Sequence, residues 1–99
     1  MESLTSAGKD FNLRVSSTLN RDAKQFGKRN MFDDNCDTCW NSDHGSPQFV
    51  ALEFPKPVSC FPMETETYHT SYKILFLSST DLYGRITIYQ MEMIGMISK

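Results

Sequence analysis

The heptapeptide QFVALEF, at Gln48–Phe54, is the part of the sequence that most clearly indicates a fold class. It is rich in aromatic and β-branched residues, and its side chains alternate between two faces, the even-numbered apolar ones facing one way. This pattern predicts a strand with one buried face. Pro55 and Pro57 follow directly. Because proline cannot donate a hydrogen bond to a β-ladder, we expect the strand to end there.

Two further runs on the C-terminal side also have strand character. Tyr72–Leu77 reads YKILFL, and Arg85–Ile94 reads RITIYQMEMI, which is the longest alternation in the chain and is followed by Gly95. Turn-forming residues separate these runs, as at Ser78–Asp81. The sequence therefore predicts an all-β protein of short strands, a sandwich or a barrel.

The N-terminal third carries weaker signals. Residues 1–12 show no period, and we expect them to be a flexible lead-in. Arg14–Leu19 could form a short strand or a turn. One helical turn is expected around Asp22–Phe26, ended by Gly27.

Composition limits the classes of function. The chain has 99 residues, 10 Lys or Arg against 12 Asp or Glu, and a formal net charge of −2, so direct nucleic-acid binding through bulk positive charge is not expected. No apolar run approaches the roughly 18–20 residues of a membrane span, and no membrane partner is expected. The N-terminus lacks the pattern of a secretory signal peptide. Together with an odd number of cysteines, three, this predicts a reducing compartment, the cytosol or nucleus.

No motif indicates an enzyme. The five glycines are scattered rather than grouped in a phosphate loop, and no nucleophile-elbow pattern is present. Cys36 and Cys39 form a C-x-x-C pair that His44 and Cys60 could complete as a zinc site. The spacing is irregular, and two free loop cysteines are the favoured interpretation. No catalytic residues are predicted.

Charge is unevenly distributed. The segment 14–29 holds five Lys or Arg and one Asp, whereas Asp33–Asp43 holds four Asp and no cation. Solvated loop faces explain such segments most simply, but a two-signed surface could also meet a partner. Oxygen-bearing side chains crowd Asp33–Thr38, which suits either an Asx-rich turn or a hard cation such as calcium, without the EF-hand pattern. Trp40, the single tryptophan, is expected to anchor the core.

A more specific resemblance covers Leu13–Phe54. In discoidin-like (coagulation factor type C) domains, an F-D-x-x-x-x-T-x-W core precedes a Q-x-V-x-L-E-F strand. The same pattern stands here at Phe32, Asp33, Thr38 and Trp40, with the strand from Gln48. The resemblance implies a galactose-binding-like jelly-roll β-sandwich, with Phe32, Trp40, Val50, Leu52 and Phe54 in its core.

The run from Ser16 to Asp43 and the closing run Tyr72–Gly95 are similar to one branch of that family, small nuclear proteins that associate with the testicular orphan nuclear receptor 4. This implies a non-enzymatic module that binds an orphan nuclear receptor and represses it by hindering its attachment to a DNA response element. The nucleus is the implied location, with the cytoplasm as a second one. The alternatives are a discoidin-like module for carbohydrate or lipid headgroups and a non-functional shortened isoform.

The resemblance fails at Pro55–Ser71, where family members carry several more strands. We therefore expect residues 13–99 to form a truncated discoidin-like domain whose sandwich lacks inner strands.

The resemblance also implies site residues. The calcium ligands of the family map onto Asp33, Asn35, Thr38 and Glu92, with Asn35 lowering the ligand charge. No cofactor is expected, and calcium is the one that the resemblance would allow. The proposed partner contact is the acidic stretch, through Asp34, Asp37 and Asp43.

Overall fold

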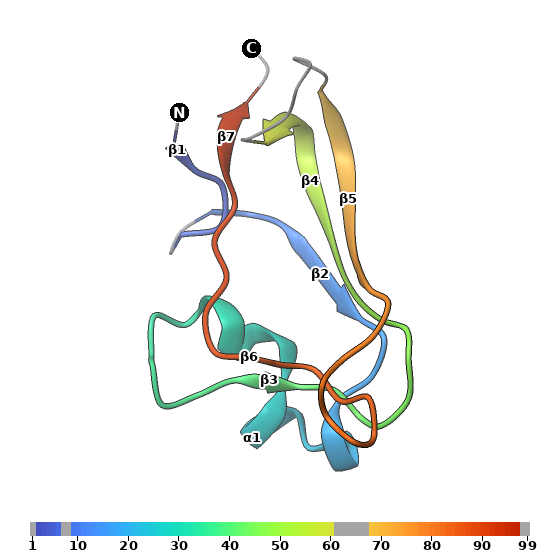
Figure 1. Ribbon diagram of the computed structural model, residues 1–99. Coiled ribbons are helices and arrows are strands. Elements are labelled where there is room, and N and C mark those ends of the chain that lie inside the picture. The colour runs from blue at the N-terminus through green and yellow to red at the C-terminus, as the bar shows by residue number, and fades with distance from the viewer. Residues whose placement is uncertain (1, 7–8, 61–67, 98–99) are drawn as a thin grey trace.

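The computed structural model describes residues 2–6, 9–60 and 68–97 of the chain (Figure 1). Short strands predominate, and the helices are pieces of three to five residues. Within the described residues, no helix has the length and apolar character needed to cross a membrane. The predicted β-rich class is confirmed, while the discoidin-like jelly roll stays a prediction of the resemblance.

Seven strands and three short helical segments follow one another along the described part of the chain. The strands are β1 (Glu2–Ser3), β2 (Asn12–Val15), β3 (Trp40–Asn41), β4 (Gln48–Cys60), β5 (His69–Phe76), β6 (Thr87–Ile88) and β7 (Ile94–Ile97). The helical segments are the 3-10 helix η1 (Leu19–Arg21), the α-helix α1 (Ala23–Phe26) and the 3-10 helix η2 (Lys28–Phe32).

The long strand β4 organises the larger sheet. Five strands pair antiparallel in the order β1-β7-β4-β2, and β5 pairs with β4 as well. The first half of β4 pairs with β2 and β5, and its last residues pair with β7. A second, two-stranded sheet pairs β3 with β6 below the larger one in Figure 1.

The prediction that Pro55 and Pro57 end the strand is wrong, because β4 continues to Cys60. Its ladder is interrupted instead: pairing stops at Glu53, and resumes at Val58 after an irregularity. The two prolines fall inside this interruption, where their missing N–H groups cost no ladder bond.

The predicted strand Arg85–Ile94 is also wrong, since only β6 and the start of β7 lie within it, and Gly95 belongs to β7. Its backbone donors bond elsewhere. The Ile86 N–H donates to Ser42 Oγ at 2.7 Å, and the Met91 N–H donates to the Met31 carbonyl at 2.8 Å. Tertiary partners therefore override the local alternation.

The other predicted elements form at about the expected positions. Tyr72–Leu77 falls largely within β5, and the helical turn is α1. The Asp22 carboxylate caps α1 by accepting from the Gln25 N–H at 3.0 Å. Gly27 follows because a Cβ there would lie 2.1 Å from the Ala23 carbonyl oxygen.

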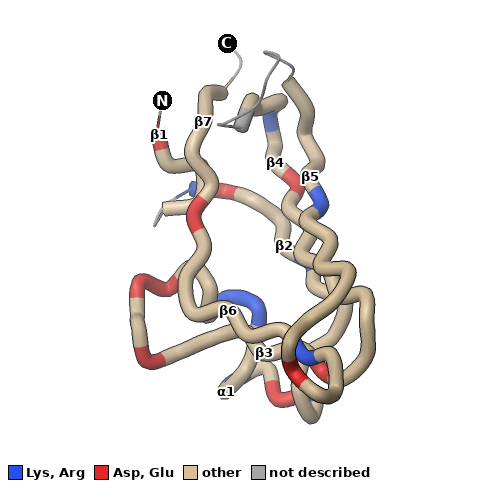
Figure 2. The backbone as a smooth tube through the Cα atoms, viewed as in Figure 1, with Lys and Arg blue, Asp and Glu red and all other residues tan. Residues whose placement is uncertain are grey.

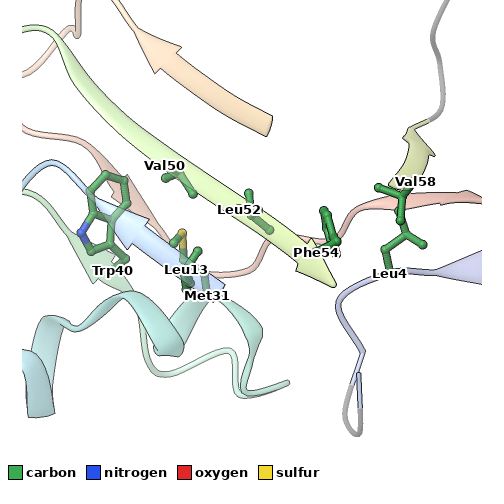
Figure 3. Close-up of a cluster of buried hydrophobic side chains, with 8 residues drawn as sticks. All are labelled: Leu4, Leu13, Met31, Trp40, Val50, Leu52, Phe54 and Val58. Carbon is green, nitrogen blue, oxygen red and sulfur yellow. The ribbon is translucent and has the colours of Figure 1, made fainter. Parts of the chain in front are cut away.

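One cluster of buried side chains joins the two sheets (Figure 3). Phe32 is half-buried and packs against this cluster. Within the expected lead-in 1–12, Leu4 is 3% exposed and β1 pairs with β7, a two-residue contact too short to leave a readable pattern. The members of the cluster are Leu4, Leu13, Met31, Trp40, Val50, Leu52, Phe54 and Val58.

Candidate partner-binding surface

Trp40, the first residue of β3, fixes the base of the loop that leads from η2 into that strand. Its side chain is 0% exposed, and its indole Nε1–H donates to the Ser17 carbonyl at 2.9 Å. A buried indole whose donor is satisfied gains apolar contact without leaving a polar group unpaired. Because Trp40 also starts β3, the segments on both sides of that strand begin from a rigid point.

A hydrogen-bond network holds the turn after β3. The Ser17 hydroxyl donates to Gln48 Oε1 at 2.7 Å and accepts from the Asp43 N–H at 3.0 Å. The Gln48 amide in turn donates to the Gly45 carbonyl at 2.9 Å, and its side chain is buried. Residues 43–48 are thereby tied to residues 16–17, far away in the sequence.

The loop between η2 and β3 is closed by side chains that bond its own backbone. Asp33 accepts from the Asn35 N–H at 3.0 Å and from the Thr38 hydroxyl, while Asn35 Oδ1 accepts from the Asp37 N–H at 2.9 Å. Such Asx turns are what the Asp- and Asn-rich composition predicts. The hydrogen bond from the Thr38 hydroxyl is the main reason that the pKa of Asp33 is lowered.

The C-terminal segment meets this loop through Gln90. Its side-chain amide donates to the Asn35 carbonyl at 2.9 Å and to Asp33 Oδ1 at 3.3 Å. Gln90 is not predicted from the sequence, because no local pattern links positions 55 and 57 residues apart. The predicted residue of this segment, Glu92, is exposed.

The four residues expected to bind calcium are therefore only partly brought together. Asp33, Asn35 and Thr38 share the loop, but both Asp33 oxygens accept hydrogen bonds, and Gln90 supplies a donor beside them. A calcium ion takes six to eight oxygen ligands, which would have to replace these hydrogen bonds. Calcium binding here stays a prediction of the resemblance.

Metal-ligating side chains do not gather elsewhere in the described part of the chain, where no three His, Cys, Asp or Glu are placed to hold an ion. Cys36 and Cys39 are free cysteines, the first exposed. The side chain of Cys60 lies outside the described residues.

The three aspartates expected to contact a partner lie at opposite ends of β3. Asp34 and Asp37 are exposed on the loop that leads into the strand, where Figure 2 shows two acidic segments. Asp43 follows the strand, and its Oδ1 accepts from the His44 backbone N–H at 2.9 Å, which is the main reason that its pKa is lowered. Arg85 also contributes to this shift.

Asp81 and Arg85 form a charged pair near Asp43. Arg85 Nε donates to Asp81 Oδ2 at 3.2 Å, and these hydrogen bonds lower the pKa of Asp81. Beside the pair, Leu82 and Tyr83 are 87% and 60% exposed. Ser78–Asp81 is predicted only as a turn, and the Asp81–Arg85 pair is not predicted, although its i,i+4 spacing is visible in the sequence.

These features define a small β-rich protein with an exposed acidic loop on a base fixed by a buried tryptophan. No family model matches the chain. It is 36% identical to the nuclear receptor 2C2-associated protein of Xenopus tropicalis, 37% identical to that of Danio rerio and 32% identical to that of Homo sapiens. The matches cover 83% of this chain and 91%, 89% and 89% of the respective relatives.

The chain therefore belongs to the nuclear receptor 2C2-associated protein family. The alignments extend over 124 or 125 residues, more than the 99 residues of the chain. Each of these relatives consequently contains residues that have no counterpart here. This chain is shorter than its relatives within the region that they share.

Proposed function

We propose that this protein is a non-enzymatic interaction module that associates with a nuclear receptor in the nucleus and represses its activity by hindering its attachment to DNA. The observation that carries the proposal is the similarity to nuclear receptor 2C2-associated proteins over 83% of the chain. Nuclear receptor 2C2, which the relatives' name gives, is the partner to test first.

The acidic loop is the proposed contact. Asp34 and Asp37 are both exposed, and the loop that carries them is closed by hydrogen bonds at Asp33. A surface that binds DNA must carry Lys and Arg to neutralise phosphates. An acidic loop on a fixed base is complementary to such a surface, so its binding would compete with DNA.

The test is co-precipitation of the full-length chain with nuclear receptor 2C2. Asp34→Asn combined with Asp37→Asn is expected to weaken binding several-fold. Asparagine is chosen because Asp34 has a φ of 56°, in a region where Asn is enriched over most other residues. Asp10→Lys changes the net charge by the same amount at an exposed site outside the loop, and should bind normally.

Competition is measured separately by a gel shift with the receptor's response element. Increasing amounts of the chain should reduce the receptor–DNA complex, and the double variant should be less effective. Receptor binding without any loss of the DNA complex would refute the repression mechanism but not the association. Equal loss of receptor binding in the double variant and Asp10→Lys would remove the acidic loop from the contact.

A further inference from the structure

The outer face of the larger sheet carries a groove of about 740 Å³, separate from the acidic loop. Strands β2, β4 and β5 form its floor, and η2 contributes to its wall. Of the described residues that line it, four are cationic and one, Glu53, is acidic. The cations are Arg14, Lys28, Arg29 and Lys73.

The strand register explains why the cations converge. Arg14 pairs with Ala51, and Ala51 pairs with Lys73, so the three residues form one row across the sheet. Residues directly opposite each other point to the same face. With strands about 4.8 Å apart, the Cα atoms of Arg14 and Lys73 stand roughly 10 Å from each other, on either side of the small Ala51.

Contacts within the fold hold two of the cations in place. Lys73 Nζ lies 4.4 Å from the centre of the Phe49 ring, and the Arg29 guanidinium lies 5.1 Å from that of Phe11. Arg29 also donates to the Phe11 carbonyl at 3.3 Å. These contacts reduce the side-chain entropy that an incoming anion would otherwise have to remove.

The next row across the sheet carries an acidic residue, Glu53, which reduces the positive charge of the groove. Asn12 pairs with Glu53, which pairs with Ser71, and the Asn12 amide donates to the Glu53 carboxylate at 3.5 Å. A carboxylate on the floor disfavours a continuous phosphate backbone. It leaves room for a ligand with spaced acidic groups and neutral or hydrogen-bonding side chains between them.

We propose that this groove binds an extended acidic peptide segment of a partner protein. The net positive charge of the groove, on a chain whose formal net charge is −2, supplies the charge complementarity. Acidic side chains two positions apart on an extended peptide are about 7 Å apart, and they reach Arg14 and Lys73 from above Ala51. This inference goes beyond the proposed receptor contact, which uses negative charge on the loop of Asp34 and Asp37 rather than positive charge on the sheet.

The test is fluorescence anisotropy of a fluorescein-labelled oligoglutamate peptide titrated with the full-length chain. We expect saturable binding that weakens as salt is raised. Arg14→Glu combined with Lys73→Glu should weaken it about tenfold, the effect of roughly 1.4 kcal/mol. Should charge reversal prevent folding, as judged by far-UV circular dichroism, Arg14→Gln combined with Lys73→Gln should still weaken it measurably.

Arg21→Glu combined with Lys24→Glu is the matched control, since it makes the same charge change at exposed residues outside the groove. This control should bind within about twofold of the unmodified chain, a difference of roughly 0.4 kcal/mol. No binding of the peptide, or equal loss in both double variants, would overturn the proposal. Tighter binding of a labelled single-stranded oligonucleotide, abolished by the same groove substitutions, would also overturn it and assign the groove to nucleic acid.

Discussion

Substitution of Leu52 by alanine tests the core most directly. Leu52 is 1% exposed, lies on the paired half of β4 and belongs to the cluster that joins the sheets. Replacing such a leucine by alanine removes its transfer free energy and leaves a cavity, which costs about 2–5 kcal/mol. A chain of this size has about 5–15 kcal/mol of total stability, so the loss would be a large fraction of it.

The matched control is Leu82→Ala. Leu82 is 87% exposed, so the same chemical change removes almost no buried contact and should alter the free energy of unfolding by less than about 0.5 kcal/mol. The two variants therefore differ in burial but not in the atoms deleted.

The assay is urea denaturation followed by the fluorescence of Trp40 and by far-UV circular dichroism. The single tryptophan reports on the core, and coincident transitions from the two signals would establish that free energies can be extracted. Equal urea midpoints for Leu52→Ala and Leu82→Ala would refute the described core.

Three further predictions follow from single contacts. Trp40 is 0% exposed, so its native emission should be blue-shifted and poorly quenched by iodide; emission at the water-exposed wavelength would contradict its burial. Hydrogen bonds from Arg85 lower the pKa of Asp81 from 3.8, so the stability that the Asp81 carboxylate contributes is present above that value and is lost as the pH falls through the lower folded-state pKa. Asp81→Asn should therefore reduce the acid-side decline of the urea midpoint with pH. The same pH dependence in the variant and the unmodified chain would count against the ion pair. Gly27→Ala would place a Cβ 2.1 Å from the Ala23 carbonyl oxygen and should cost about 1–3 kcal/mol in the same urea assay, whereas a neutral result would mean that the backbone relaxes freely there.

The elements predicted well are those set by nearby residues. The strand at Gln48–Phe54 follows from alternation alone, and α1 follows from Asp22 as its cap and Gly27 at its end. In both cases the relevant partners are within a few positions, or the buried face repeats regularly. Local pattern and tertiary structure then agree.

The elements predicted wrongly depend on distant partners. The alternation in Arg85–Ile94 indicates a strand, but the Ile86 and Met93 N–H groups donate to the hydroxyls of Ser42 and Thr5. Those partners are 44 and 88 residues away, and nothing in the local sequence names them. The continuation of β4 past its prolines is a similar case, because the position of the ladder interruption depends on β5 and β7.

The candidate site divides in the same way. The Asx turns at Asp33 and Asn35 could be expected from composition, since each side chain bonds its own backbone two residues on. Gln90 could not be expected, because its place beside Asp33 follows from the antiparallel pairing of β3 with β6. The basic groove was visible only as a charge bias in residues 14–29, since its fourth cation, Lys73, comes from β5.

The interruption in β4 affects which parts of the sheet can open locally. β4 pairs with β2 only before the prolines and with β7 only after them, whereas β5 pairs with both parts, through the single pair Val58–His69 beyond the interruption. Because residues 54–57 form no ladder pairs and one β5 pair lies beyond them, opening of the short β7 ladder need not spread to the longer one. Amide protons of β7 should therefore exchange with solvent sooner than those of Val50 and Leu52. Fraying at the chain ends would leave the tryptophan-anchored end intact.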